Sequence, residues 1–318
     1  MKISIIGAAG TVGSCTAFAL SDRGLARDLV MIDINHELLT NHLNDIKTAI
    51  SDSQSLVLRS GDYSDMAGSR IVIIAAGKHL ARAANLELSI KENLPIISEA
   101  GRNIARYCPD AVVITATNPL DPLNYVLQLV TSMPRYQLIG YSLNHTTRFR
   151  MAVAEVLGVG VSRVEAFVLG RHPGAQVPLF SSIKVDGGAV KISNEQKQAI
   201  REKSRNYLLS LVGNKSGRTA GWTTAYGIAR MTKAIAIDEC TAFPCSVVAD
   251  GEYGLKGMSI SLPAVITRTG ITQVIDLELA EEEKDELRNV AVDLQQDCRM
   301  AAGMLTRSTD EQFPGLQR

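Results

Sequence analysis

The sequence predicts an α/β protein whose first half is a doubly wound parallel sheet and whose second half is an α+β domain. Over the first 140 residues, short β-rich runs alternate with helical stretches. The runs are continuous in Val and Ile rather than alternating with polar residues, which indicates strands buried on both faces. After about residue 141 this alternation stops. We therefore expect two domains, residues 1–141 and 142–318, with a ligand cleft between them.

The first domain is expected to contain six strands, because six runs have the length and composition of buried strands. They are residues 2–6, 29–33, 56–60, 70–76, 111–115 and 137–140. In the second domain we expect a helix over 146–157, β-rich segments around 164–170 and 180–192, and then two long helices. A last helix follows the glutamates Glu281 to Glu283, whose negative charge suits a helix N-terminus.

Composition narrows the class of function. The 318 residues carry 33 Lys plus Arg and 33 Asp plus Glu, so no basic surplus exists to bind nucleic acid or an anionic membrane. The apolar runs at the N-terminus and at 71–77 are too short to span a bilayer. The five cysteines form no CxxC pair, which fits reduced thiols in the cytoplasm. We expect a cytoplasmic protein without a metal site, whose partner is a small molecule.

A glycine-rich segment directly after the first strand, GAAGTVG, predicts a phosphate-binding turn. A helix begins near its Thr, so the backbone N–H groups of the turn and the positive end of the helix meet at one place. A strand before the turn and a helix after it favour a Rossmann dinucleotide-binding fold over a chance match. The residues expected to contact the dinucleotide are Gly7, Gly10, Thr11, Val12 and Gly13.

Asp33 ends the second strand, 20 residues after Gly13. A carboxylate at this position can accept hydrogen bonds from both hydroxyls of an adenosine ribose, and it repels a 2′-phosphate. The position therefore favours NAD over NADP as the cofactor. The competing interpretation is that Asp33 is only a turn residue at the end of a strand.

Two further strand ends carry candidate ligand-binding residues. The fourth strand leads into Ala76 and Gly77, and the fifth leads into Thr117 and Asn118. Ligands of doubly wound folds bind at the carboxyl ends of the strands, so we expect Ala76, Gly77 and Thr117 to contact the cofactor. Asn118 could hydrogen-bond the substrate or the nicotinamide carboxamide, or it could simply form the turn before Pro119.

The chain resembles the lactate/malate dehydrogenase family in seven segments that occur in the family's order, from residue 2 to about 300. They are GAAGTVG, MIDI, IVIIAAG, TNPLDPLNYV, TTRFRMAVAEVLGV, VLGRHPGAQVP and GEYGLKG. The malate-type members with a lactate-dehydrogenase-like scaffold are most similar. The resemblance implies an NAD-dependent oxidoreductase that transfers a hydride between nicotinamide and a small 2-hydroxy or 2-oxo acid. Malate and oxaloacetate are the first substrates to expect. It also implies a homodimer or homotetramer.

The resemblance assigns proton transfer to His172, because the family's histidine segment reads GRHPGAQVP here. An imidazole with an ordinary pKa near 6.5 suits this role at physiological pH. The family's carboxylate-binding arginine falls on Arg148, whose planar guanidinium can hold a carboxylate through two parallel hydrogen bonds. Arg150 is expected to be a surface charge. Thr223 matches a pocket-wall position, or is a packing residue.

The chain departs from the family at the residue that should hold the catalytic imidazole. Family members have an Asp three residues before the carboxylate-binding arginine, whereas this chain has His145 there and Asn144 beside it. Neither side chain supplies the negative charge that stabilises a protonated histidine. Loss of the analogous Asp in a serine-protease triad lowers the rate by about 10⁴-fold. His145 is thus a catalytic candidate that takes the place of the family's Asp without its negative charge.

The segment between the fourth strand and its helix departs as well. Family members usually carry two arginines there, one that polarises the substrate carbonyl and one that reads the far end of the substrate. The position before the helix falls here on Asn85 or Leu86, and Arg82 is the only arginine. Arg82 is either a substrate contact or a solvated loop charge. Asn93 keeps a family-like place for contacting the cofactor ribose.

Two functions are compatible with these residues. The first is an active NAD-dependent dehydrogenase of 2-hydroxy acids, and the second is a catalytically weak NAD-binding paralogue with a regulatory or partner-binding role. The missing Asp and the altered arginine segment motivate the second. We favour the first, because the carboxylate clamp Arg148 and the proton donor His172 have no evident use in a protein that binds only NAD.

Overall fold

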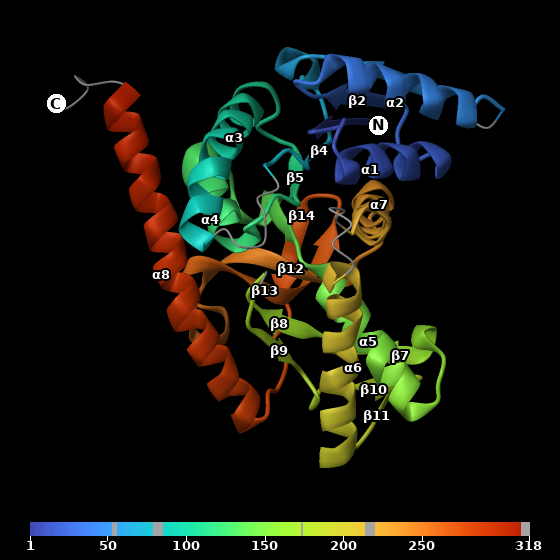
Figure 1. The fold of residues 1–318 in the computed structure, drawn as a ribbon, viewed down its shortest axis with the longest axis vertical. Coiled ribbons are helices and arrows are strands. Elements are labelled where there is room, and N and C mark those ends of the chain that lie inside the picture. Colours follow the sequence, from blue (N-terminus) through green and yellow to red (C-terminus); the bar gives the residue numbers. More distant parts are fainter. Residues whose placement is uncertain (53–55, 79–84, 173, 214–219, 313–318) are drawn as a thin grey trace.

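The first half of the chain forms the predicted parallel sheet (Figure 1). The computed structural model describes all residues except 53–55, 79–84, 173, 214–219 and 313–318. The strands are β1 (Lys2–Ile6), β2 (Asp28–Ile32), β3 (Val57–Ser60), β4 (Ile71–Ile74), β5 (Val112–Thr115) and β6 (Leu138–Tyr141). They pair in parallel in the order β3-β2-β1-β4-β5-β6. The order reverses between β1 and β4, which is where doubly wound folds open a ligand crevice.

Helices cover both faces of this sheet. The first four are α1 (Thr11–Asp22), α2 (His36–Ala49), α3 (Leu86–Tyr107) and α4 (Leu120–Thr131). Neighbouring side chains of one strand point to opposite helix layers: Ile71 and Ile73 join one hydrophobic cluster, whereas Val72 and Ile74 join another. Because both faces are buried, the strands carry continuous Val and Ile runs, as the sequence indicated.

The second half contains more strand than its sequence suggested. Its helices are α5 (Leu143–Leu157), α6 (Asn194–Gly213), α7 (Gly221–Ile237) and α8 (Glu281–Gln312). Its strands are β7 (Val164–Glu165), β8 (Val168–Gly170), β9 (Gln176–Pro178), β10 (Lys184–Val185), β11 (Gly188–Ala189), β12 (Thr241–Asp250), β13 (Lys256–Thr267) and β14 (Gly270–Val274). In the two halves together, short 3-10 turns lie at Tyr63–Met66, Arg135–Gln137, Val161–Arg163 and Glu252–Gly254. The long β12–β13 hairpin was not predicted.

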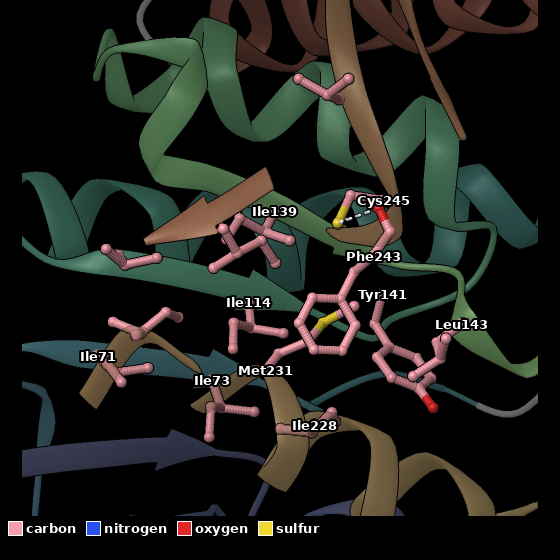
Figure 2. Close-up of a cluster of buried hydrophobic side chains, with 14 of the residues drawn as sticks. Ile71, Ile73, Ile114, Ile139, Tyr141, Leu143, Ile228, Met231, Phe243 and Cys245 are labelled. Atoms are coloured by element: carbon pink, nitrogen blue, oxygen red, sulfur yellow. Dashed lines mark hydrogen bonds between the residues drawn. The ribbon is translucent and has the colours of Figure 1, made fainter. Parts of the chain in front are cut away.

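This hairpin extends the parallel sheet of the first half. β12 pairs antiparallel with β6, with Cys245 opposite Tyr141, and β13, β8 and β9 follow. Figure 2 shows the hydrophobic cluster beneath this junction, where Phe243 of β12 and Met231 of α7 lie beside strand residues such as Ile114. One core therefore continues from the first half of the chain into the second, and it fixes the strand ends of both halves relative to each other.

Helix α8 packs along the far side of the molecule against α4 and β13 (Figure 1). The apolar residues that repeat at helical spacing along it are all buried: Leu287, Val290, Ala291, Leu294, Cys298 and Ala301. The helix begins at the predicted glutamates, and the Glu283 carboxylate accepts the backbone N–H groups of Ala280 and Ser181. Within the described residues, no helix is long and apolar enough to cross a membrane.

Candidate active site

The glycine-rich turn after β1 is shaped by close backbone approach. Gly7 has a φ of +85°, and a Cβ added to it would lie 2.3 Å from the backbone nitrogen of Ala76. A Cβ on Gly13 would lie 2.1 Å from the carbonyl oxygen of Gly7. Gly10 precedes α1, and an added Cβ there would meet only that carbonyl oxygen, at 3.4 Å. Gly7 and Gly13 are therefore required by the fold, whereas Gly10 leaves space above the turn.

The start of α1 can receive an anion. Thr11 and Val12 begin the helix, Thr11 is exposed, and none of the residues in its first turn is acidic. Backbone N–H groups at a helix start have no partner within the helix, and together with the helix dipole they attract phosphate. Gly10 removes the side chain that would obstruct such an approach.

Asp33 is held at the end of β2 beside this turn. Its Oδ2 accepts the N–H of Ala9 at 2.8 Å, and its Oδ1 accepts the N–H of Asn35 at 2.9 Å. The carboxylate is partly exposed, so each oxygen keeps lone pairs that can accept further hydrogen bonds. The turn, the helix start and this carboxylate together fit an adenosine diphosphate, which is the part of NAD that the first half of a Rossmann fold holds.

The ends of β4 and β5 meet beside the turn. The hydroxyl of Thr117 donates to the carbonyl oxygen of Ala76 at 2.6 Å, and a Cβ on Gly77 would lie 2.8 Å from the Thr117 methyl carbon. The Asn93 amide is buried and binds the backbone of Lys78, accepting its N–H at 2.6 Å. Asn93 thus positions the start of the 78–86 segment, and its contact with a cofactor ribose stays a prediction.

Asn118 follows at the end of β5 with its side chain exposed. It makes no side-chain hydrogen bond with the residues that the structure describes. Its amide can therefore bond a ligand at the sheet edge, and this role stays a prediction.

His172 lies between β8 and β9, next to His145 of α5. The two ring centroids are 4.4 Å apart in an edge-to-face arrangement, and Nδ1 of His172 is buried without a hydrogen-bond partner among the described residues. The side-chain nitrogen of Gln176, on β9, lies 2.5 Å from Nδ1 of His145. Folding therefore brings the two predicted histidines together. His145 lies beside the His172 ring, at the position where the family resemblance implies an Asp.

The pKa of His172 is not near its ordinary value, contrary to the sequence-based expectation. Burial, assisted by the Arg148 guanidinium, lowers the pKa of His172 to about 4. Burial, His172 and Arg148 likewise hold the pKa of His145 well below 6.5, although the Gln176 contact opposes this. Both imidazoles are therefore neutral at physiological pH before a substrate binds.

A buried carboxylate that sequence reasoning missed contacts the same loop. Asp121 is fully buried, and its Oδ2 accepts the backbone N–H of His172 at 2.5 Å while its Oδ1 accepts the Ser246 hydroxyl at 2.5 Å. Burial raises the pKa of Asp121 to about 7, against the opposing effect of these two hydrogen bonds. Asp121 thus holds the main chain of His172 rather than its imidazole. Its place in TNPLD, just after a ligand-binding strand end, was the only available signal.

Arg148 projects from α5 with its guanidinium partly buried. Burial lowers the pKa of Arg148, and no described residue forms a hydrogen bond or ion pair with it. A partly buried, uncompensated guanidinium beside two imidazoles is a strong site for a carboxylate. Arg150 points elsewhere, as expected, but it is no free surface charge: it donates to the carbonyl oxygens of Val164 and Val161.

Two other predicted positions have different surroundings. Thr223 is exposed on α7, and its carbonyl oxygen accepts the Tyr141 hydroxyl at 3.2 Å. Asn144 accepts the same hydroxyl at 2.7 Å and donates to the Thr224 hydroxyl at 3.0 Å. The Asn144 amide therefore ties α5 to α7, and the ring that lies against His172 is that of His145.

The segment before α3 is described only at its ends. Arg82 lies outside the described residues. Asn85 is the N-cap of α3, and its side-chain oxygen accepts the N–H of Leu88 at 2.8 Å. Lys78 pairs with Glu92 at 2.7 Å. At the position expected to hold an arginine, the chain therefore has a helix cap.

A pocket of about 270 Å³ opens beside the histidine pair. Its lining includes His145, Arg148, Gly174 and Gln176 from the site, together with Phe149, Val168, Pro178, Arg201, Ser204 and Arg205. Three guanidinium groups and the His145 imidazole line it, and no described acidic side chain does. The arrangement can hold a small anion and exchange a proton with it.

Comparison with known families covers nearly the whole chain. Residues 1–140 match the family described as lactate/malate dehydrogenase, NAD binding domain. Residues 143–303 match the family described as lactate/malate dehydrogenase, alpha/beta C-terminal domain.

Individual relatives agree with this match. A malate dehydrogenase of Natronomonas pharaonis is 33% identical over 293 residues, which cover 91% of this chain and 96% of the relative. An L-lactate dehydrogenase of Priestia megaterium is 30% identical over 304 residues, covering 93% and 95%. Among solved structures, the Cryptosporidium parvum lactate dehydrogenase complexed with lactic acid and nicotinamide adenine dinucleotide superposes with a TM-score of 0.88 at 28% identity, covering 95% of this chain and 98% of that one.

Proposed function

The chain belongs to the lactate/malate dehydrogenase family, whose members are NAD-dependent dehydrogenases of 2-hydroxy acids, and from this premise we propose that it interconverts malate and oxaloacetate. The observation that carries the proposal is the uncompensated Arg148 guanidinium beside the half-buried His145–His172 pair. The malate dehydrogenases among its relatives favour the same acid. The interpretation as a weak NAD-binding paralogue receives no support from the comparisons.

Arg148 holds the substrate carboxylate through two parallel hydrogen bonds. This contact places the substrate's C2 oxygen near His172, the group that exchanges its proton. Nδ1 of that imidazole is buried, so we assign the exchange to Nε2. In the oxidation of the hydroxy acid the neutral imidazole accepts the hydroxyl proton, and in the reduction of the oxo acid the protonated imidazole donates it. NAD, when bound, carries the hydride. His145 and Asn118 support the site, the first beside the imidazole and the second as a hydrogen-bond donor.

The cofactor site follows from the strand ends. We assign the pyrophosphate to the turn and helix start formed by Gly7, Gly10, Thr11, Val12 and Gly13, since the added-Cβ distances leave an approach above Gly10. The site then continues along the edges of β4 and β5.

The adenosine ribose is assigned to Asp33, and the nicotinamide half to the β4 and β5 ends with Ala76, Gly77 and Thr117. Asn93 contributes by holding Lys78, at the start of the 78–86 segment. The domain boundary falls between residues 141 and 142, next to the start of α5 at Leu143.

We also propose that the protein is a cytoplasmic homo-oligomer. Phe18 on α1 and Trp222 and Tyr226 on α7 are exposed by 39%, 68% and 57%, and the two helices pack against each other. Exposed aromatic side chains on adjoining helices are typical of a subunit interface. Among the described cysteines, Cys108, Cys240, Cys245 and Cys298 are free thiols, as in proteins of a reducing compartment.

The test of the activity is NADH oxidation with oxaloacetate and with pyruvate, in wild type and His172→Asn. We expect turnover of oxaloacetate, and a loss of at least 100-fold in kcat in the variant with unchanged NADH affinity, because only proton transfer is removed. Turnover that survives in His172→Asn would contradict the role of this imidazole. NADH binding without turnover of any acid in wild type would contradict the dehydrogenase proposal.

A further inference from the structure

The pocket beside the histidine pair extends beyond the residues that the reaction needs. Its outer part is formed by Arg201, Ser204 and Arg205 of α6. These positions are separated by three and four residues, so they share one face of the helix. Helix α6 packs against α5, the helix that carries Arg148 (Figure 1).

One of the two positive charges of this outer part is uncompensated. Arg201 pairs with Glu286 of α8 at 2.9 Å and lies 5.2 Å above the Phe180 ring. Arg205 makes no hydrogen bond or ion pair with any described residue. Together with Arg148, two of the three guanidinium groups that line the pocket therefore lack a counter-charge within the described chain.

Ser204 adds an unpartnered polar atom between the two arginines. Its Oγ is buried and has no hydrogen-bond partner among the described residues, although Ser204 lines the pocket. A buried hydroxyl without a partner is destabilising unless a ligand or water completes it. The hydroxyl and the Arg205 guanidinium are both groups that donate to anionic oxygens.

We propose that Arg201, Ser204 and Arg205 form a second anion subsite that binds the distal anionic group of the substrate. The carboxylate at C1 occupies Arg148, so the groups on α6 are left for a second charge, which can be a carboxylate or a sulfonate. The enzyme then selects 2-oxo acids with two anionic groups through α6. This inference rests on the proposed 2-hydroxy acid dehydrogenase activity.

The experiment compares 2-oxo acids that match in length and differ in the distal charge. Oxaloacetate is paired with 2-oxobutanoate and 2-oxoglutarate with 2-oxopentanoate, and 3-sulfopyruvate distinguishes a sulfonate from a carboxylate. We expect Arg205→Gln to lower kcat/KM for the dianionic acids by about 10- to 100-fold, mainly through KM, since it removes a charged hydrogen bond. The monoanionic acids should change by less than about twofold, and Arg205→Lys should retain part of the selectivity.

The matched control is Lys203→Gln. It removes one positive charge from the same helix, at a residue that pairs with Glu155 and does not line the pocket. Equal losses for mono- and dianionic acids in Arg205→Gln, or the same selectivity loss in Lys203→Gln, would overturn the subsite.

If wild type reduces none of these acids, the proposed activity fails separately. Calorimetric binding of succinate and butyrate then decides on the subsite. Tighter binding of succinate that Arg205→Gln abolishes would support the subsite, and equal binding of the two acids would overturn it.

Discussion

At the scale of single residues, the unusual feature is a neutral histidine where the family resemblance implies a carboxylate. The ring centroids of His145 and His172 are 4.4 Å apart, and Nδ1 of His145 lies 2.5 Å from the side-chain nitrogen of Gln176. A neutral neighbour stabilises the protonated form of a buried imidazole far less than a carboxylate does. The pKa of about 4 for His172 is consistent with this arrangement.

The first prediction concerns the pH dependence of oxo acid reduction. In the proposed mechanism the reduction needs the protonated His172, whose pKa is lowered to about 4. The value of kcat/KM should therefore rise about tenfold for each unit by which the pH falls from 7 to 5. His145→Asp places a negative charge beside the imidazole and should raise its pKa. The rising limb should then lie at higher pH, with at least a tenfold gain at pH 7. Steady-state kinetics from pH 5 to 8 measure both effects.

His145→Asn is the control, because it removes the ring without adding charge. Its limb should stay at low pH, as in wild type. A His145→Asp profile that coincides with that of His145→Asn would mean that the carboxylate does not reach the imidazole, and the positioning role of His145 would be wrong.

At the scale of elements, the β1–α1 unit contains glycines that the fold requires, Gly7 and Gly13, and one, Gly10, whose place we propose is required by the cofactor. A Cβ at Gly13 would lie 2.1 Å from backbone, whereas one at Gly10 would lie 3.4 Å away, which is an ordinary contact distance. Gly10 also has a φ of −70°, which alanine adopts without strain.

The corresponding prediction uses these two positions as a pair. Gly13→Ala should lower the unfolding free energy by about 1–3 kcal/mol, because backbone must move to admit the methyl group. Gly10→Ala should leave the unfolding free energy within about 0.5 kcal/mol and weaken NADH binding by at least tenfold. Urea unfolding and NADH fluorescence titration measure the two quantities. Wild-type NADH affinity in Gly10→Ala would remove the pyrophosphate from this turn.

At the scale of the whole molecule, a single sheet runs from β3 to β9 through the β6–β12 pair. The proposed active site depends on this continuity, since Asp121 of α4, Ser246 of β12 and the His172 loop are joined by hydrogen bonds across the two halves. Relative motion of the halves would break a buried network, so we expect them to unfold together.

The oligomer prediction also belongs to this scale. Trp222→Glu puts a charge into the exposed aromatic face of α1 and α7 and should convert the oligomer into smaller species, because a buried unpaired charge is strongly destabilising. Val292→Glu, at a 59% exposed position on α8, is the control and should leave the assembly intact. Size-exclusion chromatography with light scattering gives the masses. A monomeric wild type, or an unchanged Trp222→Glu oligomer, would contradict the interface.

The sequence by itself determined the parts of the protein whose physics is local. All six strands of the parallel sheet lie within one or two residues of the predicted runs, because strands buried on both faces need unbroken apolar side chains. The long β12–β13 hairpin was missed. Its strands contain Pro244 and Pro263, a residue type that usually argues against strand interiors, and only the folded hairpin shows them lying opposite each other.

Tertiary structure decided the chemistry of the site. Motif order marked His172, Arg148 and the glycines, but burial, which lowers the pKa of His172, depends on segments far apart in the chain. The contact of Asp121 with the His172 backbone spans 51 residues, and α6 reaches the pocket only through its packing on α5. Backbone preferences act between sequence neighbours, whereas desolvation and charge act through space, so only the folded chain sets them.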